Sequence, residues 1–281
     1  MKQLTHGGDW AGYRAEFGRD PLDFSANVSP LGLPEGVAKA ITAALATADR
    51  YPDPLCRALR EKLAVAEGVP AEWLLCGNGA ADLIFRLALA AKPRTALVTA
   101  PTFAEYATAL ETAGCTVERH FLREENDFAV TKDLLNAVHP GTNMVFLCQP
   151  NNPTGQAIPL SDIRRVVALA AQLSIPVIID EAYGDYLPRE ESAIGLTDTF
   201  ENLVVLRSFS KAHGLAGIRA GYGILPPQLT VPLDNITHPY ICSCPARAVA
   251  QAALEDEGFL DHTRQVTAQL KAPFLTEQWD T

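Results

Sequence analysis

Short apolar runs recur along the chain, each bounded by proline, glycine, asparagine or a charged residue. Four of them have the length of strands: Thr95–Ala100, Asn143–Gln149, Ile175–Asp180 and Asn202–Ser208. Runs that are apolar without alternation are typical of strands buried on both faces of a parallel sheet. The pattern therefore predicts central strands that are covered by helices on each side.

The segments between these runs have helical periodicity. "PLSDIRRVVALAAQL" places five apolar residues on one helical face: Ile163, Val166, Val167, Ala170 and Leu173. Strands that alternate with helices predict βαβ units, and hence a three-layer α/β/α fold around a mostly parallel central sheet. In such sheets, ligands bind beyond the carboxyl ends of the strands.

The composition is that of a folded globular enzyme, with 281 residues of which 48% are hydrophobic and 20% charged. A formal charge of −10 argues against nucleic acid as a partner, so an anionic substrate would need a local cluster of donors. The chain starts without an apolar leader and has no run of about eighteen apolar residues, so we expect a cytoplasmic protein without a membrane span. The cysteines lack metal-ligand spacing and are expected to be reduced and to pack as small hydrophobes.

Four motifs stand at the predicted strand ends. "PNNPTG" follows Gln149, "EAYGDY" follows Asp180, "FSKAHGLAGIR" follows Ser208, and "GNGAAD" follows "WLLC". Each motif alone is weak, because "NPTG" is a common turn sequence and a single lysine such as Lys211 can be a surface residue. Their joint occurrence at strand ends favours one shared ligand site.

The same motifs form part of a longer ordered series: "HGG", "DFSANVSPLGLP", "YPDP", "GNGA", "NNPTG", "DEAY" and "SFSKAHGLAGIRAGY". With this series the chain resembles the fold-type I pyridoxal-phosphate (PLP) enzymes of the aminotransferase class I/II family. It is most similar there to the L-threonine-O-3-phosphate decarboxylases and their relatives, the histidinol-phosphate aminotransferases. The resemblance implies an aspartate aminotransferase-like large domain, PLP as cofactor and a cytoplasmic homodimer.

The resemblance assigns roles around the cofactor ring. Lys211 matches the lysine that attaches PLP covalently, and burial would favour the neutral amine that this chemistry needs. Asp180 matches the carboxylate that pairs with the pyridine nitrogen, which keeps the ring an electron sink. Tyr183 and Asn152 match groups that hydrogen-bond the ring oxygen, and Phe103 matches a stacked aromatic ring. Lys211, Asp180 and Tyr183 are thus the expected catalytic residues.

The phosphate of the cofactor needs hydrogen-bond donors. Backbone amides at a helix N-terminus bind anions, and a guanidinium can grip phosphate through two bonds. The resemblance implies that the donors are the amides of Gly79, Ala80 and Ala81 and the side chains of Ser208, Ser210 and Arg219. Tyr51 matches a tyrosine that family members extend across the dimer interface to the partner's cofactor phosphate.

The substrate is expected to lie under the N-terminal segment. An "HGG" segment covers the substrate in the decarboxylases, so the resemblance implies that His6, Gly7 and Gly8 bind substrate. Asn27 matches a substrate-contacting asparagine of the family. The alternative for His6, Gly7 and Gly8 is that they belong to an unstructured amino end.

The resemblance also implies a domain organisation: an N-terminal arm (1–35), a large PLP-binding domain (36–244) and a helix leading into a truncated small domain (245–281). Family members continue into a small lobe with the arginine that binds the substrate's α-carboxylate. The last dozen residues here do not resemble that lobe. Cofactor binding therefore follows from the sequence more directly than turnover does.

Three functions stay open at this point. The first is a PLP-dependent lyase that removes CO2 from L-threonine O-3-phosphate, giving (R)-1-amino-2-propanol O-2-phosphate, a cobalamin precursor. The second is an aminotransferase acting on histidinol phosphate and 2-oxoglutarate. The third is a truncated protein that binds PLP with weak or absent turnover. The first two differ in which bond at the substrate Cα stands perpendicular to the cofactor ring.

Overall fold

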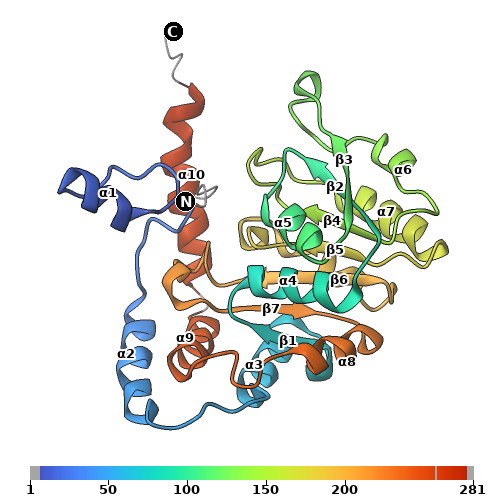
Figure 1. Ribbon diagram of the computed structural model, residues 1–281. Helices are drawn as coiled ribbons and strands as arrows, with labels where there is room; N and C mark the ends of the chain where they lie inside the picture. The colour runs from blue at the N-terminus through green and yellow to red at the C-terminus, as the bar shows by residue number, and fades with distance from the viewer. Residues whose placement is uncertain (1–6, 257, 277–281) are drawn as a thin grey trace.

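One sheet forms the framework of the molecule. The computed structural model describes residues 7–256 and 258–276, and within them seven strands form a sheet in the order β1-β7-β6-β5-β4-β2-β3 (Figure 1). The strands are β1 (Leu74–Gly77), β2 (Thr95–Ala100), β3 (Thr116–Phe121), β4 (Met144–Cys148), β5 (Val177–Asp180), β6 (Leu203–Ser208) and β7 (Gly221–Ile224).

The sheet is mostly parallel. Strands β3, β2, β4, β5 and β6 run in one direction, and β7 runs antiparallel to both β6 and β1. Asp180 is paired with Cys148 on one side and with Leu206 on the other, so the carboxyl ends of β4, β5 and β6 lie side by side. The predicted α/β/α fold around a mostly parallel sheet is confirmed.

Helices cover both faces of this sheet. The helices of the described residues are α1 (Trp10–Phe17), α2 (Glu35–Ala44), α3 (Arg57–Glu67), α4 (Ala80–Ala91), α5 (Glu105–Thr112), α6 (Leu134–Ala137), α7 (Leu160–Gln172), α8 (Pro227–Ile236), α9 (Cys244–Glu255) and α10 (Phe259–Thr276), and α1 is the one that stands away from the sheet. Helices α4, α5 and α8 share one hydrophobic core with the sheet, and α3, α7 and α9 share the other. Alternate strand residues feed the two cores: Val98 and Phe146 face one, Leu97 and Val145 the other. Within the described residues, no helix is long and apolar enough to cross a membrane.

The predicted elements agree closely with the observed ones. Thr95–Ala100 forms β2 in full. Helix α7 buries the apolar face predicted for it, except that Leu173 follows the helix end and is partly buried. Strand β5 begins at Val177 rather than Ile175, because Pro176 has no amide hydrogen to donate to a neighbouring strand.

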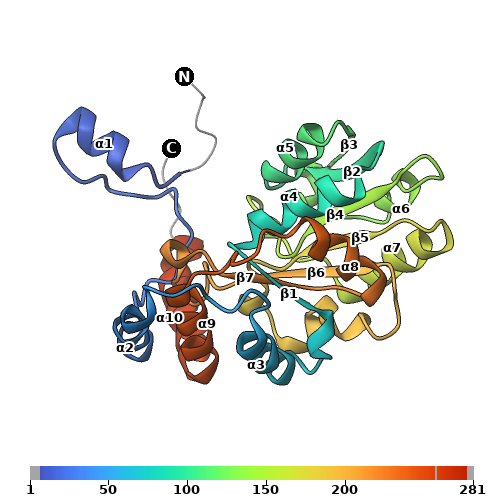
Figure 2. The same cartoon turned by 60° about the horizontal axis from the view of Figure 1, so that its bottom comes forward.

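The N-terminal segment lies outside the layers of sheet and helices. Helix α1 stands away from the sheet, and α2 packs along α9 (Figures 1 and 2). Between them the chain reaches the carboxyl edge of the sheet, where the Ser29 amide donates to the Lys211 carbonyl at 2.9 Å. Ser29 Oγ also lies 3.2 Å from Oγ1 of Thr263 in α10. This anchor holds the segment beside the turn that follows β6.

Candidate cofactor site

A cavity of about 160 Å³ opens at the carboxyl ends of β4, β5 and β6. It is lined by Ala80, Ala81, Phe103, Cys148, Asn152, Asp180, Ala182, Tyr183, Ser208, Ser210, Lys211, Ala216 and Arg219. The cavity therefore brings together every residue predicted to bind the cofactor except Gly79, which directly precedes Ala80, and Tyr51.

The carboxylate of Asp180 forms the floor of this cavity. Asp180 is the last residue of β5 and is 2% exposed. Its Oδ2 accepts a hydrogen bond from the Tyr106 hydroxyl at 2.8 Å, and its Oδ1 accepts one from the Ala182 amide at 2.9 Å. Burial raises the pKa of Asp180, because the loss of solvation of the anion outweighs the hydrogen bonds from Tyr106 and Ala182 and the attraction of Lys211. A cation brought against this carboxylate would therefore be stabilised.

Sequence reasoning missed Tyr106, which fixes one oxygen of Asp180. Tyr106 is fully buried on α5, and its ring meets that of Phe103 edge to face with centroids 5.5 Å apart. The available signal was its position three residues after Phe103, which places the two rings close together at a helix start. Sequence reasoning also missed Cys148, which lines the cavity. Burial raises the pKa of its thiol to about 12, so the thiol stays neutral and forms an apolar part of the wall.

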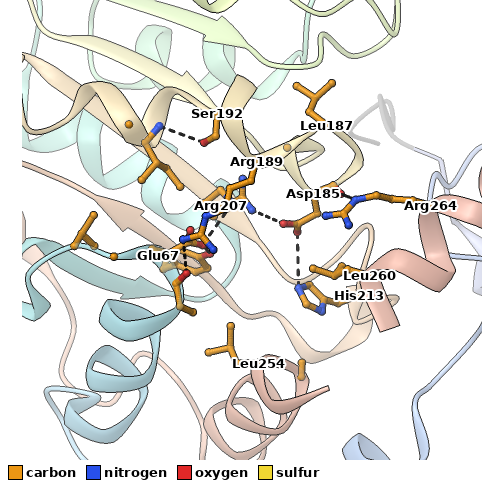
Figure 3. Close-up of a pocket in the computed structure, with 18 of the residues that line it drawn as sticks. Glu67, Asp185, Leu187, Arg189, Ser192, Arg207, His213, Leu254, Leu260 and Arg264 are labelled. Carbon is orange, nitrogen blue, oxygen red and sulfur yellow. Dashed lines mark hydrogen bonds and ion pairs between the residues drawn. The ribbon is translucent and has the colours of Figure 1, made fainter. Parts of the chain in front are cut away.

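Glu181, the next residue, belongs to a different network on the other side of the sheet. Its carboxylate accepts from Nη1 of Arg207 at 3.0 Å, from the Ser192 hydroxyl at 2.7 Å and from the Ala193 amide at 2.7 Å. Arg207 also binds Asp185. Ser192, Arg207 and Asp185 of this network line a second cavity of about 360 Å³ (Figure 3). The network ties the end of β5 to β6 and so fixes the geometry of both strand ends.

His213 packs in this second cavity rather than in the cofactor site. It is 6% exposed, with Nε2 3.8 Å from Oδ2 of Asp185 (Figure 3), and burial lowers the pKa of the imidazole. His213 is therefore a packed residue, although it lies only two positions after Lys211 in the sequence.

Lys211 lies on the turn that follows β6. Its Nζ sits 5.2 Å from the centroid of the Tyr183 ring. The Tyr183 hydroxyl accepts a hydrogen bond from Nδ2 of Asn27 at 3.4 Å, which links the N-terminal segment to the cavity. Lysine, tyrosine and asparagine are thus adjacent although they are far apart in the chain.

The opposite end of the cavity is suited to an anion. Helix α4 begins after Gly79, whose φ of 82° is left-handed and which has no side chain to cap the first amides of the helix. Nη2 of Arg219 lies 2.7 Å from the place where a Cβ on Gly79 would stand. Ser208 and Ser210 line the same end of the cavity. Free amides, hydroxyls and a guanidinium together form an anion-binding donor set.

A wider cleft of about 610 Å³ adjoins this cavity, with Tyr183 and Asn152 lining both. Asn27 lines the cleft, as does Lys271 of α10, a cation that sequence reasoning did not single out. The cleft is the open approach to Lys211.

Other predicted residues lie apart from the cavity. Tyr51 is 84% exposed and stacks on Tyr240, with ring centroids 4.7 Å apart. Gly7 and Gly8 are exposed, and the Gly8 amide donates to Oγ of Ser25 at 2.9 Å. His6 lies outside the described residues. Within one chain, most of the residues predicted to bind the cofactor line one cavity. Of the residues predicted to bind the substrate, Asn27 lies in the adjoining cleft, and Gly7 and Gly8 line neither space.

Comparison with known proteins identifies the family. The model of the family "Aminotransferase class I and II" matches residues 19–275. The chain belongs to this family. It is 35% identical to threonine-phosphate decarboxylase of Salmonella typhimurium over 263 residues, which cover 92% of this chain and 72% of that protein. It is 36% identical to histidinol-phosphate aminotransferase 1 of Cupriavidus pinatubonensis over 268 residues, covering 92% and 70%.

Solved structures agree with this assignment. The chain superimposes on histidinol-phosphate aminotransferase from Sinorhizobium meliloti, solved in complex with pyridoxal-5'-phosphate, with a TM-score of 0.84 and 27% identity. The match covers 96% of this chain and 74% of that one. The aminotransferase class I and II enzymes depend on PLP, so the cofactor expected from the sequence is the cofactor of the family.

The residues present fit that cofactor. The uncapped amides of α4 and the Arg219 guanidinium suit a phosphate. The buried Asp180 carboxylate suits a protonated ring nitrogen, and Phe103 lines the cavity with an aromatic surface for a planar ring. Lys211 supplies the primary amine that PLP chemistry requires.

Proposed function

We propose that this chain is a PLP-dependent enzyme for a phosphorylated amino acid, and that it decarboxylates L-threonine O-3-phosphate to (R)-1-amino-2-propanol O-2-phosphate. The observation that carries the proposal is the convergence of Lys211, Asp180 and the anion-binding end of α4 on one cavity. The similarity to a threonine-phosphate decarboxylase over 92% of the chain supports this choice of substrate. The product would serve cobalamin synthesis.

The chain's own residues have distinct tasks in this proposal. Arg219 and the amides of α4 would hold the cofactor phosphate. Asp180, oriented by Tyr106, holds the proton on the ring nitrogen. Tyr183 and Asn152 orient the ring oxygen. When bound, PLP supplies the sink for the negative charge that develops at the substrate Cα.

Lys211 would hold the cofactor through its amine and would be the group that moves a proton at the substrate Cα. Its Nζ lies against the Tyr183 ring, at the boundary between the cavity and the open cleft. An amine at this boundary can reach a substrate that enters through the cleft. Lys271 offers a cation to the anionic groups of such a substrate in the same cleft.

The alternative is a histidinol-phosphate aminotransferase, and the 36% identity to such an enzyme favours it. Both reactions place a phosphorylated amine in the cleft. They diverge in whether the carboxylate or the hydrogen at Cα is aligned with the ring system, which depends on where the substrate's anionic groups are held.

Parallel assays with the two substrates test the proposal. Purified chain with PLP should release CO2 from L-threonine O-3-phosphate in a saturable manner, and should show little 2-oxoglutarate-dependent turnover of histidinol phosphate. Lys211→Ala should abolish the release. The reverse preference would establish the aminotransferase, and PLP binding without either turnover would contradict both assignments.

We also propose a homodimer in which Tyr51 reaches the partner's cofactor phosphate. The exposed Tyr51 ring, held by stacking on Tyr240, supports this, because a large exposed aromatic pair is suited to an interface.

A further inference from the structure

A buried arginine lies behind the turn that joins β1 to α4. Arg86, in the middle of α4, is 6% exposed. Its Nη2 donates to the Cys76 carbonyl at 3.0 Å and to Oδ2 of Asp82 at 2.7 Å, and its Nη1 donates to Oγ1 of Thr237 at 2.5 Å. One side chain therefore connects β1, the first turn of α4 and the residue that follows α8.

Asp82 connects this arginine to the turn itself. The same oxygen, Oδ2, also accepts a hydrogen bond from the Asn78 amide at 3.0 Å. Asn78 directly precedes Gly79, whose amide is the first of the three that are expected to bind the cofactor phosphate. The carboxylate thus holds the chain one residue before those amides and helps to set the direction in which they point.

The turn packs tightly against this pair and against β7. A Cβ on Gly77 would lie 2.8 Å from Nη2 of Arg86 and 2.9 Å from Oδ2 of Asp82. A Cβ on Gly221, the first residue of β7, would lie 2.8 Å from the Ala80 amide nitrogen. Contacts this short leave little room around the turn, so its backbone path depends on where the Asp82–Arg86 pair lies.

The charges of the pair also matter, because the site is suited to an anion. Asp82 lies in the first turn of α4, where its carboxylate alone would repel a phosphate at the helix start. Arg86 forms an ion pair with that carboxylate, and the two side chains are 7% and 23% exposed, so solvent screens the pair only in part. Because the arginine offsets the repulsion, the carboxylate can accept the bond from the turn without weakening anion binding.

We propose that Asp82 and Arg86 are positioning residues that hold the turn between β1 and α4 in the conformation that binds the cofactor phosphate. Both lie behind the turn rather than among the residues that line the cofactor cavity, so they act through the amides of Gly79, Ala80 and Ala81. This role rests on the assignment of the phosphate to these amides in the proposed function.

Two substitutions of Asp82 separate the hydrogen bond from the charge. Asp82→Asn and Asp82→Ala remove the same charge, but only the asparagine keeps an oxygen that can accept from the Asn78 amide. We expect Asp82→Ala to bind PLP about tenfold more weakly than Asp82→Asn, because the turn loses its acceptor. Pyridoxal, which lacks the phosphate, should bind equally to the two variants. Equal PLP affinities would overturn the proposal, and so would a parallel loss of pyridoxal affinity, which would indicate general disruption.

Two further variants are the controls. Leu87→Ala removes a side chain that is buried on the same helix and has no polar group for the turn, so it should lower stability without changing the ratio of PLP to pyridoxal affinity. Arg219→Gln tests the phosphate site itself and should lower that ratio. If it does so while the two Asp82 variants bind PLP alike, the phosphate assignment stands and the positioning role fails. If Arg219→Gln leaves the ratio unchanged, the phosphate assignment fails and the positioning role fails with it.

Amide hydrogen exchange, followed by NMR in cofactor-free protein, gives a readout that needs no cofactor. The Asn78 amide should be protected in the wild type and in Asp82→Asn, and should exchange about tenfold faster in Asp82→Ala, where its bond is lost. Arg86→Lys keeps the charge but cannot bond the Cys76 carbonyl, Asp82 and Thr237 together, so it should also speed this exchange. Equal rates in the wild type and Asp82→Ala would overturn the proposal, and an unchanged rate in Arg86→Lys would overturn the role of Arg86.

Discussion

Asp180 and Glu181 are adjacent carboxylates with opposite surroundings. Asp180 lines the cofactor cavity, whereas Glu181 is bonded to Arg207, Ser192 and Ala193 across the sheet. We expect Asp180→Asn to lower turnover per bound PLP by about a hundredfold or more, because the ring nitrogen loses its anionic partner. Glu181→Gln should instead cost about 3 kcal/mol of stability by leaving Arg207 under-compensated.

These two effects are separated by measuring kcat per bound PLP and urea unfolding for both variants. An equal loss of kcat in the two variants would contradict the assignment of Asp180.

The Asp180 carboxyl should also make the cofactor-free chain sensitive to pH. Burial raises the pKa of Asp180 in the folded chain, so the folded state keeps this proton to a higher pH than the unfolded state. Stability from this group is therefore fully present below about pH 4 and is lost as pH rises through the folded pKa. In urea unfolding of cofactor-free protein from pH 4 to 7.5, the wild type should lose more stability than Asp180→Asn. Parallel pH profiles for the two proteins would rule this out.

Single residues show what the sequence could and could not reveal about the site. Asp180 was predictable because it ends one apolar run, and Lys211 because it lies three residues after the end of another, within a motif of the family that the chain resembles. Tyr106 was not predictable as a partner of Asp180, because its hydroxyl reaches that carboxylate across 74 positions of sequence. Contacts between side chains on different elements depend on helix packing angles, which periodicity does not encode.

At the scale of elements, the start of α4 is the feature most directly tied to the cofactor. Gly79 has φ 82° and ψ 165°, a region that is essentially restricted to glycine, and a Cβ there would meet Arg219 Nη2 at 2.7 Å. Gly79→Ala should push this flexible guanidinium aside and lower PLP affinity by about tenfold. Gly114→Ala is the matched control, since Gly114 has φ 81° and open space around its Cβ position.

PLP titration and thermal unfolding of both glycine variants provide the measurement. Both should lose stability through the backbone, but only Gly79→Ala should lose affinity. A similar loss of affinity in Gly114→Ala would show that general strain, rather than the phosphate cradle, is responsible.

Most elements could be predicted because the central strands are buried on both faces and read as unbroken apolar runs. Strand β3 escaped this pattern, since its sequence "TVERHF" alternates and its residues are partly exposed at the sheet edge. The antiparallel direction of β7 was also not predictable, because its four residues "GYGI" carry no directional signal.

At the scale of the whole molecule, Tyr51 lies outside the cavity of its own chain. If it serves the partner's site, co-expression of Tyr51→Ala and Lys211→Ala chains should restore activity, because one of the two sites in a mixed dimer is then free of both changes. A random mixture should recover about a quarter of wild-type activity. No recovery above the separate variants would indicate that Tyr51 acts within its own chain or has no role.

The division into an arm (1–35), a large domain (36–244) and a C-terminal part (245–281) stays a prediction. In the structure, the segment carrying α1 stands off the sheet, while Thr263 of α10 donates a hydrogen bond to the Ala212 carbonyl beside Lys211.

The central claim is that Lys211 attaches PLP, and borohydride reduction tests it most directly. Holo protein is reduced with borohydride and digested, and the cofactor mass is located by mass spectrometry. The modification should lie on Lys211, should be absent in Lys211→Ala and should persist in Lys271→Ala, which changes the lysine of the adjoining cleft. Modification of Lys271 or another lysine, or a cofactor that still dissociates after reduction, would contradict the account.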